Sequence, residues 1–390
     1  MKRFLLTGLA ACMAAAPAMA DITVAHVYGR TGPLEAYAAQ SHTGLMLGIE
    51  YATGGTFEVN GEPIVVNEYD TQLDPAIGRA MLAQAFGDDD ADIAVGPVSS
   101  GVALAMLPIA EEYERILIVE PAVADSITGE AWNRYIFRTG RNSSQDAIAN
   151  AVALGGEGVT IATLAQDYAF GRDGVAAFRE ALEGTGATIA HEEYVPTDTT
   201  DFTAAAERIF AAMADIEGPK RLFIIWAGGG NPMGAINAME PERYGIEIAT
   251  GGNILAALVA YRELEGMEGA TYYYYDIPDN PVNDWLVEQH FERFGTPPDF
   301  FTAGGMAAGI AVVEAIRRAG STDTEELIEV MEGMEWETPK GTMMFRPEDH
   351  QALQAMYHFR IRVEDDVAWG IPELVRELAI DEMDIPLRNQ

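Results

Sequence analysis

The stretch "DIAVGPVSSGVALAM", from Asp92 to Met106, decides how this sequence is interpreted. Its apolar run Ile93–Val95 predicts a buried strand that ends at a Gly-Pro pair. Ser99 and Ser100 follow, and the apolar residues after them are typical of a helix. A strand followed directly by a helix is the unit of open parallel α/β sheets, which bind ligands beyond the carboxyl ends of their strands.

The same alternation recurs along the chain. Apolar, β-branched runs predict strands at "ITVAHVYG", "PIVVNEYD", "DIAVGP", "RILIVEP", "VTIATLAQ", "ATIAHEEYV", "RLFIIWAG" and "IEIATGG". Helical spacing predicts helices at Pro75–Phe86, Ser144–Leu154, Gly174–Leu182 and Phe202–Met213. This alternation predicts parallel sheets that helices cover on both faces. A chain of 390 residues is too long for one ordinary core and is typical of two domains.

The last third of the chain has a different pattern. "TYYYYDIPDNPVNDW", from Thr271, predicts an aromatic strand and then a turn. Trp285–Met334 is rich in helix signals. "TPKGTMMFRPEDHQALQAMYHFRIRVEDD", from Thr338 to Asp366, predicts two strands around a turn.

Residues 1–20, "MKRFLLTGLAACMAAAPAMA", have the features of an export signal. Two basic residues precede an apolar run that is too short to span a bilayer. The small residues at its end predict cleavage after Ala20. A lipoprotein-type site at Cys12 is the less favoured alternative, because the apolar run before it is very short. We therefore expect a periplasmic protein, and we expect no later segment to span a membrane.

Composition excludes several kinds of site and partner. Cys12 is the only cysteine, so cleavage would leave no disulfide, thiolate nucleophile or cysteine metal site. The formal net charge of −37 opposes binding to nucleic acid and to anionic lipid. The six histidines (26, 42, 191, 290, 350 and 358) are scattered and show no zinc-site spacing. We expect neither a metal nor a cofactor.

Two enzymatic interpretations fit the sequence poorly. A serine hydrolase needs a nucleophile next to a base, but "GPVSSG" does not match the G-x-S-x-G motif. The loop "IIWAGGGNPMG" has glycines at 228, 230 and 234, which miss the G-x-G-x-x-G spacing of dinucleotide sites. An exported hydrolase remains a remote alternative, and we expect no enzymatic activity.

Ser99 and Ser100 are better explained by binding than by nucleophilic attack. The first turn of a helix has backbone N–H groups without internal partners and carries the positive end of the helix dipole. A carboxylate placed there gains from both, and a serine hydroxyl adds another donor. The alternative is that Ser100 only caps its helix.

Several longer segments, in their order, resemble the periplasmic leucine/isoleucine/valine-binding-type proteins of ABC importers. They are "GRTGPLEAYA", "NGEPIVVNEYDTQLDPAIG", "VGPVSSGVALAMLPIAEEYERILIVEPAV", "RYIFRTGRNSSQDA", "QDYAFGRDGVAAF", "YVPTDTTDFT" and "FRPEDHQALQAMY". No single string is specific, but their order extends over most of the chain after residue 20.

The resemblance implies two α/β lobes with doubly wound parallel sheets, joined by three hinge crossovers, with the ligand between them. The crossovers are expected near Thr139–Ser143, Tyr274–Asp279 and Met343–Pro347. Lobe 1 then comprises residues 21–140 and 277–343, and lobe 2 comprises residues 141–276 and 344–390.

The resemblance also implies which residues reach the ligand. It assigns the ligand's carboxylate to Ser99 or Ser100, and it brings the loop "VEPAVADS", with Ala122, Val123 and Ala124, to the same cleft. Aromatic walls are expected from Tyr37, Tyr168, Trp226 and Phe301. Gly228 and Asn253 complete the expected ligand-binding set, Gly228 because a glycine lets the backbone approach closely.

Two departures from the family put the ligand's amine in doubt. Amino-acid-binding relatives carry a hydroxyl residue where this chain has Ala124, and an acidic residue where it has Gly251-Gly252-Asn253. An ammonium group needs a counter-charge when it leaves water. Either Asp125, Asp276 or another acid supplies it, or the ligand is an apolar or aromatic carboxylate without an amine.

The resemblance implies a monomeric solute-binding protein that delivers a small amino acid or an apolar or aromatic carboxylate to an ABC permease. The alternative is a sensor of the same fold that binds a membrane receptor, which the sequence does not distinguish.

Overall fold

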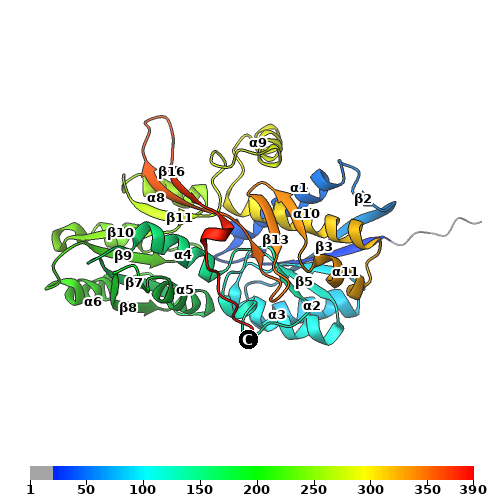
Figure 1. Ribbon diagram of the computed structural model, residues 1–390, viewed down its shortest axis with the longest axis horizontal. Coiled ribbons are helices and arrows are strands. Elements are labelled where there is room, and N and C mark those ends of the chain that lie inside the picture. Colours follow the sequence, from blue (N-terminus) through cyan, green and yellow to red (C-terminus); the bar gives the residue numbers. More distant parts are fainter. Residues whose placement is uncertain (1–20) are drawn as a thin grey trace, which may run out of the picture.

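The computed structural model describes residues 21–390, so the expected signal peptide and the Cys12 alternative lie outside the described residues. Two α/β lobes lie side by side, each with its own parallel sheet (Figure 1). This arrangement confirms the predicted fold class.

Lobe 1 is built on a six-stranded sheet with the order β2-β3-β1-β4-β5-β6. Its strands are β1 (Ile22–Tyr28), β2 (Glu58–Val59), β3 (Glu62–Asp70), β4 (Ile93–Val95), β5 (Ile116–Val119) and β6 (Ile136–Arg138). Neighbouring strands are parallel except in the β2–β3 pair. β4 and β5 are wholly buried, as expected for strands that helices cover on both faces.

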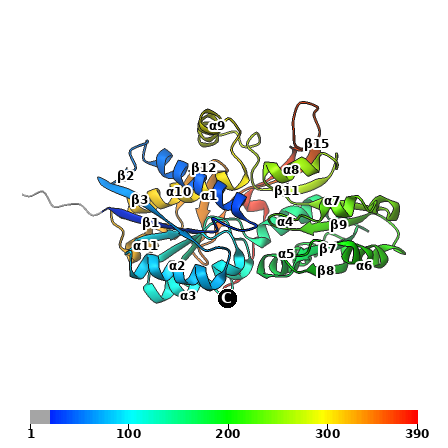
Figure 2. The same cartoon turned by 180° about the vertical axis from the view of Figure 1, so that it is seen from behind.

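Helices cover both faces of this sheet (Figures 1 and 2). α1 (Glu35–Ala52) and α10 (Phe300–Ala319) pack together on one face, and α2 (Pro75–Gly87) and α3 (Ser100–Tyr113) pack on the other. α9 (Pro281–Phe294) and α11 (Thr324–Met331) complete the helices of the lobe. α1 and α10 can approach closely because Gly44 of α1 has no side chain. A Cβ on Gly44 would lie only 2.1 Å from the Thr302 carbonyl oxygen of α10.

Lobe 2 contains a parallel sheet and a smaller antiparallel sheet. The parallel sheet has the order β10-β9-β7-β8, with β7 (Thr160–Gln166), β8 (Thr188–Val195), β9 (Lys220–Ile225) and β10 (Ile246–Thr250). The antiparallel sheet has the order β11-β15-β16, with β11 (Glu268–Thr271), β15 (Met356–Arg362) and β16 (Ile371–Leu378). Its helices are α4 (Ser143–Leu154), α5 (Ala169–Ala181), α6 (Thr203–Met213), α7 (Met233–Asn237) and α8 (Leu255–Tyr261).

Two predictions about the last third of the chain are wrong. The aromatic run is not a strand, because β11 ends at Thr271 and Tyr272–Tyr274 are buried beyond it. Tyr272 instead donates to the Phe300 carbonyl oxygen, at 2.7 Å. The segment Thr338–Asp366 contains more than two strands, because it includes β13 (Gly341–Phe345), β14 (Ala352–Leu353) and β15.

We propose that the third connection between the lobes lies further along the chain than the expected Met343–Pro347. β13 and β14 pair with β12 (Glu335–Thr338) in a small sheet, and Trp336 of that sheet donates to the Ala307 carbonyl of α10 in lobe 1. The chain enters the lobe 2 sheet only at β15. We therefore propose that lobe 1 comprises residues 21–140 and 277–353, and lobe 2 comprises residues 141–276 and 354–390.

α10 is, among residues 21–390, the one helix long and apolar enough to cross a membrane by length and composition. The sequence analysis expects no such segment. In the structure 89% of its apolar window is buried inside the protein, as in the core helix of a globular lobe.

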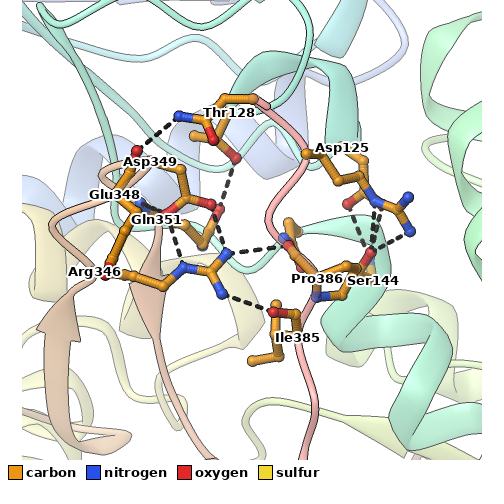
Figure 3. Close-up of polar contacts among 12 residues, drawn as sticks. Asp125, Thr128, Ser144, Arg346, Glu348, Asp349, Gln351, Ile385 and Pro386 are labelled. Carbon is orange, nitrogen blue, oxygen red and sulfur yellow. Dashed lines mark hydrogen bonds and ion pairs between the residues drawn. The ribbon is translucent and has the colours of Figure 1, made fainter.

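The C-terminal segment contacts both lobes (Figure 3). Arg346, next to β13, donates to the carbonyl oxygens of Ile385 and Pro386 at 2.7 and 3.2 Å. Arg388 pairs with Asp125 of lobe 1 at 2.8 Å and donates to Ser144 of α4 in lobe 2 at 3.0 Å. The last residues are thus fixed across the junction of the lobes.

Candidate ligand-binding site

A cavity of about 110 Å³ lies between the two lobes. The first-turn residues of four helices line it: Ser100 of α3, Ser143 of α4, Phe170 of α5 and Phe300 of α10. The cavity therefore lies beyond the carboxyl ends of the parallel strands, where open α/β sheets bind ligands. Four helix N-termini make its surroundings electropositive, which favours an anionic group in the ligand.

Seven of the 26 residues that line the cavity are aromatic. Tyr37 and Phe301 come from lobe 1, with ring centroids 4.4 Å apart. Tyr168 and Trp226 come from lobe 2. Phe170 lies beside Tyr168, with ring centroids 5.8 Å apart. Flat apolar walls of this kind suit an apolar or aromatic side group, at roughly 25 cal/mol per Å² buried.

Ser100 lines the cavity and also fixes the loop after β5. Its Oγ accepts the backbone N–H groups of Val123 and Ala124, at 3.3 and 3.2 Å. With its lone pairs occupied, the hydroxyl has its O–H left to donate. A ligand carboxylate is the matching acceptor.

The backbone N–H groups of this loop already have partners within the protein. The N–H groups of Val123 and Ala124 are bonded to Ser100, and the Ala122 N–H donates to the Pro97 carbonyl at 3.3 Å. The Val123 carbonyl accepts the Ser143 hydroxyl at 3.0 Å. None of the three residues therefore provides a free backbone N–H donor, and of the three only Val123 lines the cavity.

Seven of the predicted residues line the cavity and four do not. The lining includes Tyr37, Ser100, Val123, Tyr168, Trp226, Asn253 and Phe301. Ser99, Ala122, Ala124 and Gly228 lie outside it. Ser99 occupies the N-cap position of α3, and Ala122 and Ala124 are buried in the lobe 1 core.

Gly228 contributes to the contact between the lobes. Its N–H donates to the Tyr37 hydroxyl at 2.9 Å, and the same hydroxyl donates to Asn253 Oδ1 at 2.9 Å. Gly228 has φ of +79°, and a Cβ there would lie 2.7 Å from Leu34 Cδ2 and 2.8 Å from the Pro33 oxygen of lobe 1. The glycine therefore permits the lobe 2 loop to touch lobe 1, so the lobes are closed over the cavity.

The acids considered for an ammonium group do not face the cavity. Asp125 is already bonded to the Ser144 N–H at 2.9 Å and paired with Arg388, and Asp276 is exposed. A side chain at Gly252 is excluded sterically, because a Cβ would lie 2.2 Å from Thr271 Oγ1. No acid can therefore occupy that position of the loop.

Sequence reasoning missed two charged residues of the lining, Arg141 and Asp146. Arg141 Nε donates to Asp146 Oδ1 at 3.1 Å, and the side chains are 11% and 29% exposed. Burial alone would lower the pKa of Arg141, but the adjacent Asp146 carboxylate, together with Tyr272 and Glu120, outweighs burial and the pKa is raised. The guanidinium therefore stays charged.

Among residues 21–390, no cluster of three His, Cys, Asp or Glu side chains is arranged to hold a metal ion.

The chain is similar to proteins of known class over nearly its whole length. Leu/Ile/Val-binding protein homolog 6 of Brucella melitensis biotype 1 is 25% identical over 94% of each chain. An ABC-type branched-chain amino acid transporter from Rhodopseudomonas palustris CGA009, solved as a crystal structure, is 65% identical over 95% of this chain and 100% of its own, with a TM-score of 0.85. A solute-binding protein of an ABC transporter from Rhodopseudomonas palustris BisB5, solved with 3,4-dihydroxybenzoic acid, is 26% identical over 94% of this chain and 99% of its own, with a TM-score of 0.79.

These similarities agree with the resemblance in the sequence motifs. The chain is a solute-binding protein of an ABC transporter, and its role is non-catalytic, which sets the hydrolase alternative aside. Residues 21–366 match the profile of the periplasmic binding proteins, and the chain belongs to that family.

Proposed function

We propose that this solute-binding protein captures a small carboxylate with an apolar or aromatic side group and encloses it between its lobes. As a monomer in the periplasm, freed from its signal peptide after Ala20, it delivers the ligand to an ABC permease in the membrane. The observation that carries the proposal is a cavity between the lobes, lined by seven aromatic residues, by the first turns of four helices and by Ser100.

The size of the cavity supports a ligand of about one aromatic ring. An engineered protein cavity of roughly 150 Å³ admits benzene, and this cavity measures about 110 Å³ in the closed arrangement. A small carboxylate such as benzoate or 4-methylpentanoate matches that scale.

The relatives support a carboxylate and differ about the amine. The 65% identical relative is described as a branched-chain amino acid transporter, and the 26% identical one holds 3,4-dihydroxybenzoic acid. Both kinds of ligand carry a carboxylate beside an apolar or aromatic group. We take that common part as the ligand class.

A leucine-like amino acid is the second candidate, and Asp146 is the observation that favours it. Asp146 lines the cavity and is the acid that the sequence analysis leaves unplaced. Its carboxylate is already paired with Arg141, so it offers an ammonium only part of a full counter-charge. For that reason we rank the amine-free carboxylate first.

A thermal-shift screen with matched pairs tests the ligand class. Each pair contains an amino acid and its deaminated analogue, such as leucine with 4-methylpentanoate and phenylalanine with 3-phenylpropanoate, and benzoate is added as a ring carboxylate. A specific ligand raises the melting temperature by mass action. Stabilisation by the amine-free members supports the proposal. Strong stabilisation by the amino acids alone would select the second candidate, and no response to any carboxylate would refute both.

A further inference from the structure

Arg141 differs from the other well-buried arginines of this protein in what its donors contact. Arg138 donates through Nε to Gln351 at 2.6 Å and through Nη1 to the Ala124 carbonyl at 2.7 Å, and its Nη2 donates to Thr128. Arg346 is similarly occupied by Asp349 and by backbone carbonyls of the C-terminal segment (Figure 3). In Arg138 and Arg346, the guanidinium nitrogens therefore already donate hydrogen bonds to acceptors within the protein.

The two terminal nitrogens of Arg141 have no such partner. Only its Nε donates to a protein acceptor, Asp146, among residues 21–390. Nη1 and Nη2 are not sealed off by protein atoms, and the residue lines the cavity. A guanidinium with an open pair of donors is the geometry that binds a carboxylate through two parallel hydrogen bonds.

The position of the guanidinium is fixed by its surroundings. Its Cζ lies 4.8 Å from the centroid of the Tyr272 ring and 5.2 Å from that of Phe300. The hydrogen bond from Nε to Asp146 Oδ1, at 3.1 Å, is a further contact that holds the guanidinium. Because the side chain is held before a ligand arrives, binding would cost little conformational entropy.

We infer that Arg141 is the specificity-determining anchor for the ligand's carboxylate, which it binds through Nη1 and Nη2, and that Asp146 positions it. This inference rests on the proposed function and names a residue of the site that binds the anionic group. Ser100 and the N-terminus of α3 then assist the anchor. The side chain of the ligand extends along the aromatic walls.

Matched ligands that differ only at the carboxylate test the inference. The pairs are benzoate and benzamide, 4-methylpentanoate and 4-methylpentanamide, and L-leucine and L-leucinamide, which keeps its ammonium. Titration calorimetry uses the pair whose carboxylate member stabilises the wild-type protein. Arg141→Met should weaken binding of the carboxylate roughly 10- to 100-fold, as for a lost hydrogen bond between charged groups. Binding of the amide should change less than about 3-fold, because a neutral amide gains little from a guanidinium.

Two further variants complete the experiment. Arg134→Met removes the same charge from an exposed arginine that pairs with Glu325, and it should leave both ligands unaffected. Arg141→Lys keeps the positive charge but cannot form the bidentate pair of hydrogen bonds, so the variant should retain part of the preference for the carboxylate over the amide. It also carries the test if Arg141→Met does not fold, since the carboxylate should still lose more affinity than the amide.

The results separate this inference from the proposed function. An unchanged preference for the carboxylate in Arg141→Met, or an equal loss for both ligands, would overturn the role of Arg141 while leaving the solute-binding proposal intact. If the wild-type protein binds none of the carboxylates, the proposed ligand class itself fails.

Discussion

Ser100 shows how one side chain serves both the fold and the site. Its Oγ accepts two backbone N–H groups from the loop after β5, and its hydroxyl lines the cavity. Under the proposed function, the loop and the ligand therefore depend on the same atom. A substitution here must affect affinity and stability together, whereas Ser99 lies outside the lining.

We predict that Ser100→Ala weakens ligand binding by about 1–3 kcal/mol, the cost of a lost hydrogen bond to a charged group. The variant also leaves two buried N–H groups without an acceptor, so the free energy of unfolding should fall by about 1–3 kcal/mol. Calorimetric titration and denaturant unfolding measure the two effects. Ser99→Ala is the control and should change affinity little. Equal effects of both variants would place the carboxylate elsewhere.

Gly228 is the residue whose missing side chain permits the lobes to touch. An added Cβ would approach Leu34 and Pro33 of lobe 1 to less than 3 Å, and this clash exists only when the lobes are closed. We therefore predict that Gly228→Ala weakens ligand affinity about tenfold. Gly230→Ala is the matched control, since Gly230 also has a positive φ, of +67°, and a Cβ there meets nothing within 4 Å. If the two variants bind equally well, the loop does not limit closure.

The residues show what a sequence can and cannot predict about this site. Ser100 is predictable because it follows a buried strand and begins a helix, both of which are local signals. The role of Arg141 is not predictable in this way, because nothing in the neighbouring sequence distinguishes Arg141 from Arg138. Arg138 is occupied by Gln351, which is 213 positions away in the chain. The distant partner Gln351 therefore determines which of the two arginines keeps unpaired donors. The local sequence around the arginines does not indicate that partner.

At the scale of elements, the parallel α/β units were accessible to sequence analysis because each strand and helix has its own periodicity. β16 and the small β12-β13-β14 sheet were not, because their strands are defined by pairing with distant segments. The prediction of a strand in the aromatic run after β11 is wrong for a related reason. Tyr272 and Tyr273 have high strand propensity, but they donate to Phe300 and Asn283 of lobe 1 and are buried against the core residues of that lobe instead.

The N-termini of α8 and α10 meet at Asp299, which gives the closed state a pH dependence. Asp299 caps α10 through the Phe300 N–H at 2.7 Å and accepts the Leu255 N–H of α8 at 3.0 Å. Burial raises the pKa of Asp299 to about 6, although these bonds and the Gln40 amide favour the ionised form. Opening the lobes would expose the carboxylate and return its pKa towards the ordinary value of about 4.

Closing therefore takes up a proton between these two pKa values, and protonation favours the closed state. We predict that ligand affinity is constant above about pH 7 and rises as the pH falls below about 6. The gain is about tenfold between pH 7 and pH 5, because one pKa unit corresponds to a factor of ten. Asp299→Asn should remove this dependence. Titration calorimetry of both proteins across this range gives the answer, and an identical pH profile for the two would exclude Asp299 as its source.

At the scale of the whole molecule, the C-terminal segment holds the two lobes at their junction (Figure 3). Arg388 contacts Asp125, Ser144 and Glu180, which lie in η1 (Asp125–Ile127), α4 and α5. Asp125 is buried, so removing its partner Arg388 leaves a buried carboxylate without a counter-charge, which destabilises the folded protein. We predict that Arg388→Ala lowers the free energy of unfolding by about 1–3 kcal/mol.

The matched control for Arg388 is Arg376→Ala, which removes an exposed pair with Glu382 and should cost less than about 1 kcal/mol. Denaturant unfolding compares both variants with the wild-type protein. A loss for Arg388→Ala no greater than that of the control would mean that the segment adds nothing to the union of the lobes.

The proposed function requires the lobes to close over the ligand, and the contacts between the lobes predict how to measure this closure. The Tyr37 hydroxyl links lobe 1 to Gly228 and Asn253, and Asp299 links it to Leu255. These bonds join groups on different lobes, so they are lost when the lobes separate. Ligand fills the cavity between the lobes and stabilises the state in which the bonds form.

We therefore predict that saturating ligand reduces the radius of gyration of the wild-type protein in solution scattering. Tyr37→Phe keeps the ring against Phe301 but removes both hydroxyl bonds. Its affinity should fall by roughly 1–3 kcal/mol, mainly through faster dissociation, because the bonds act after the ligand has entered. The scattering of ligand-saturated Tyr37→Phe should still show compaction, because the ligand contacts on both lobes remain. A wild-type radius that does not change at saturation would mean that the lobes do not close on the ligand, and the Tyr37 contacts would then belong to a rigid junction.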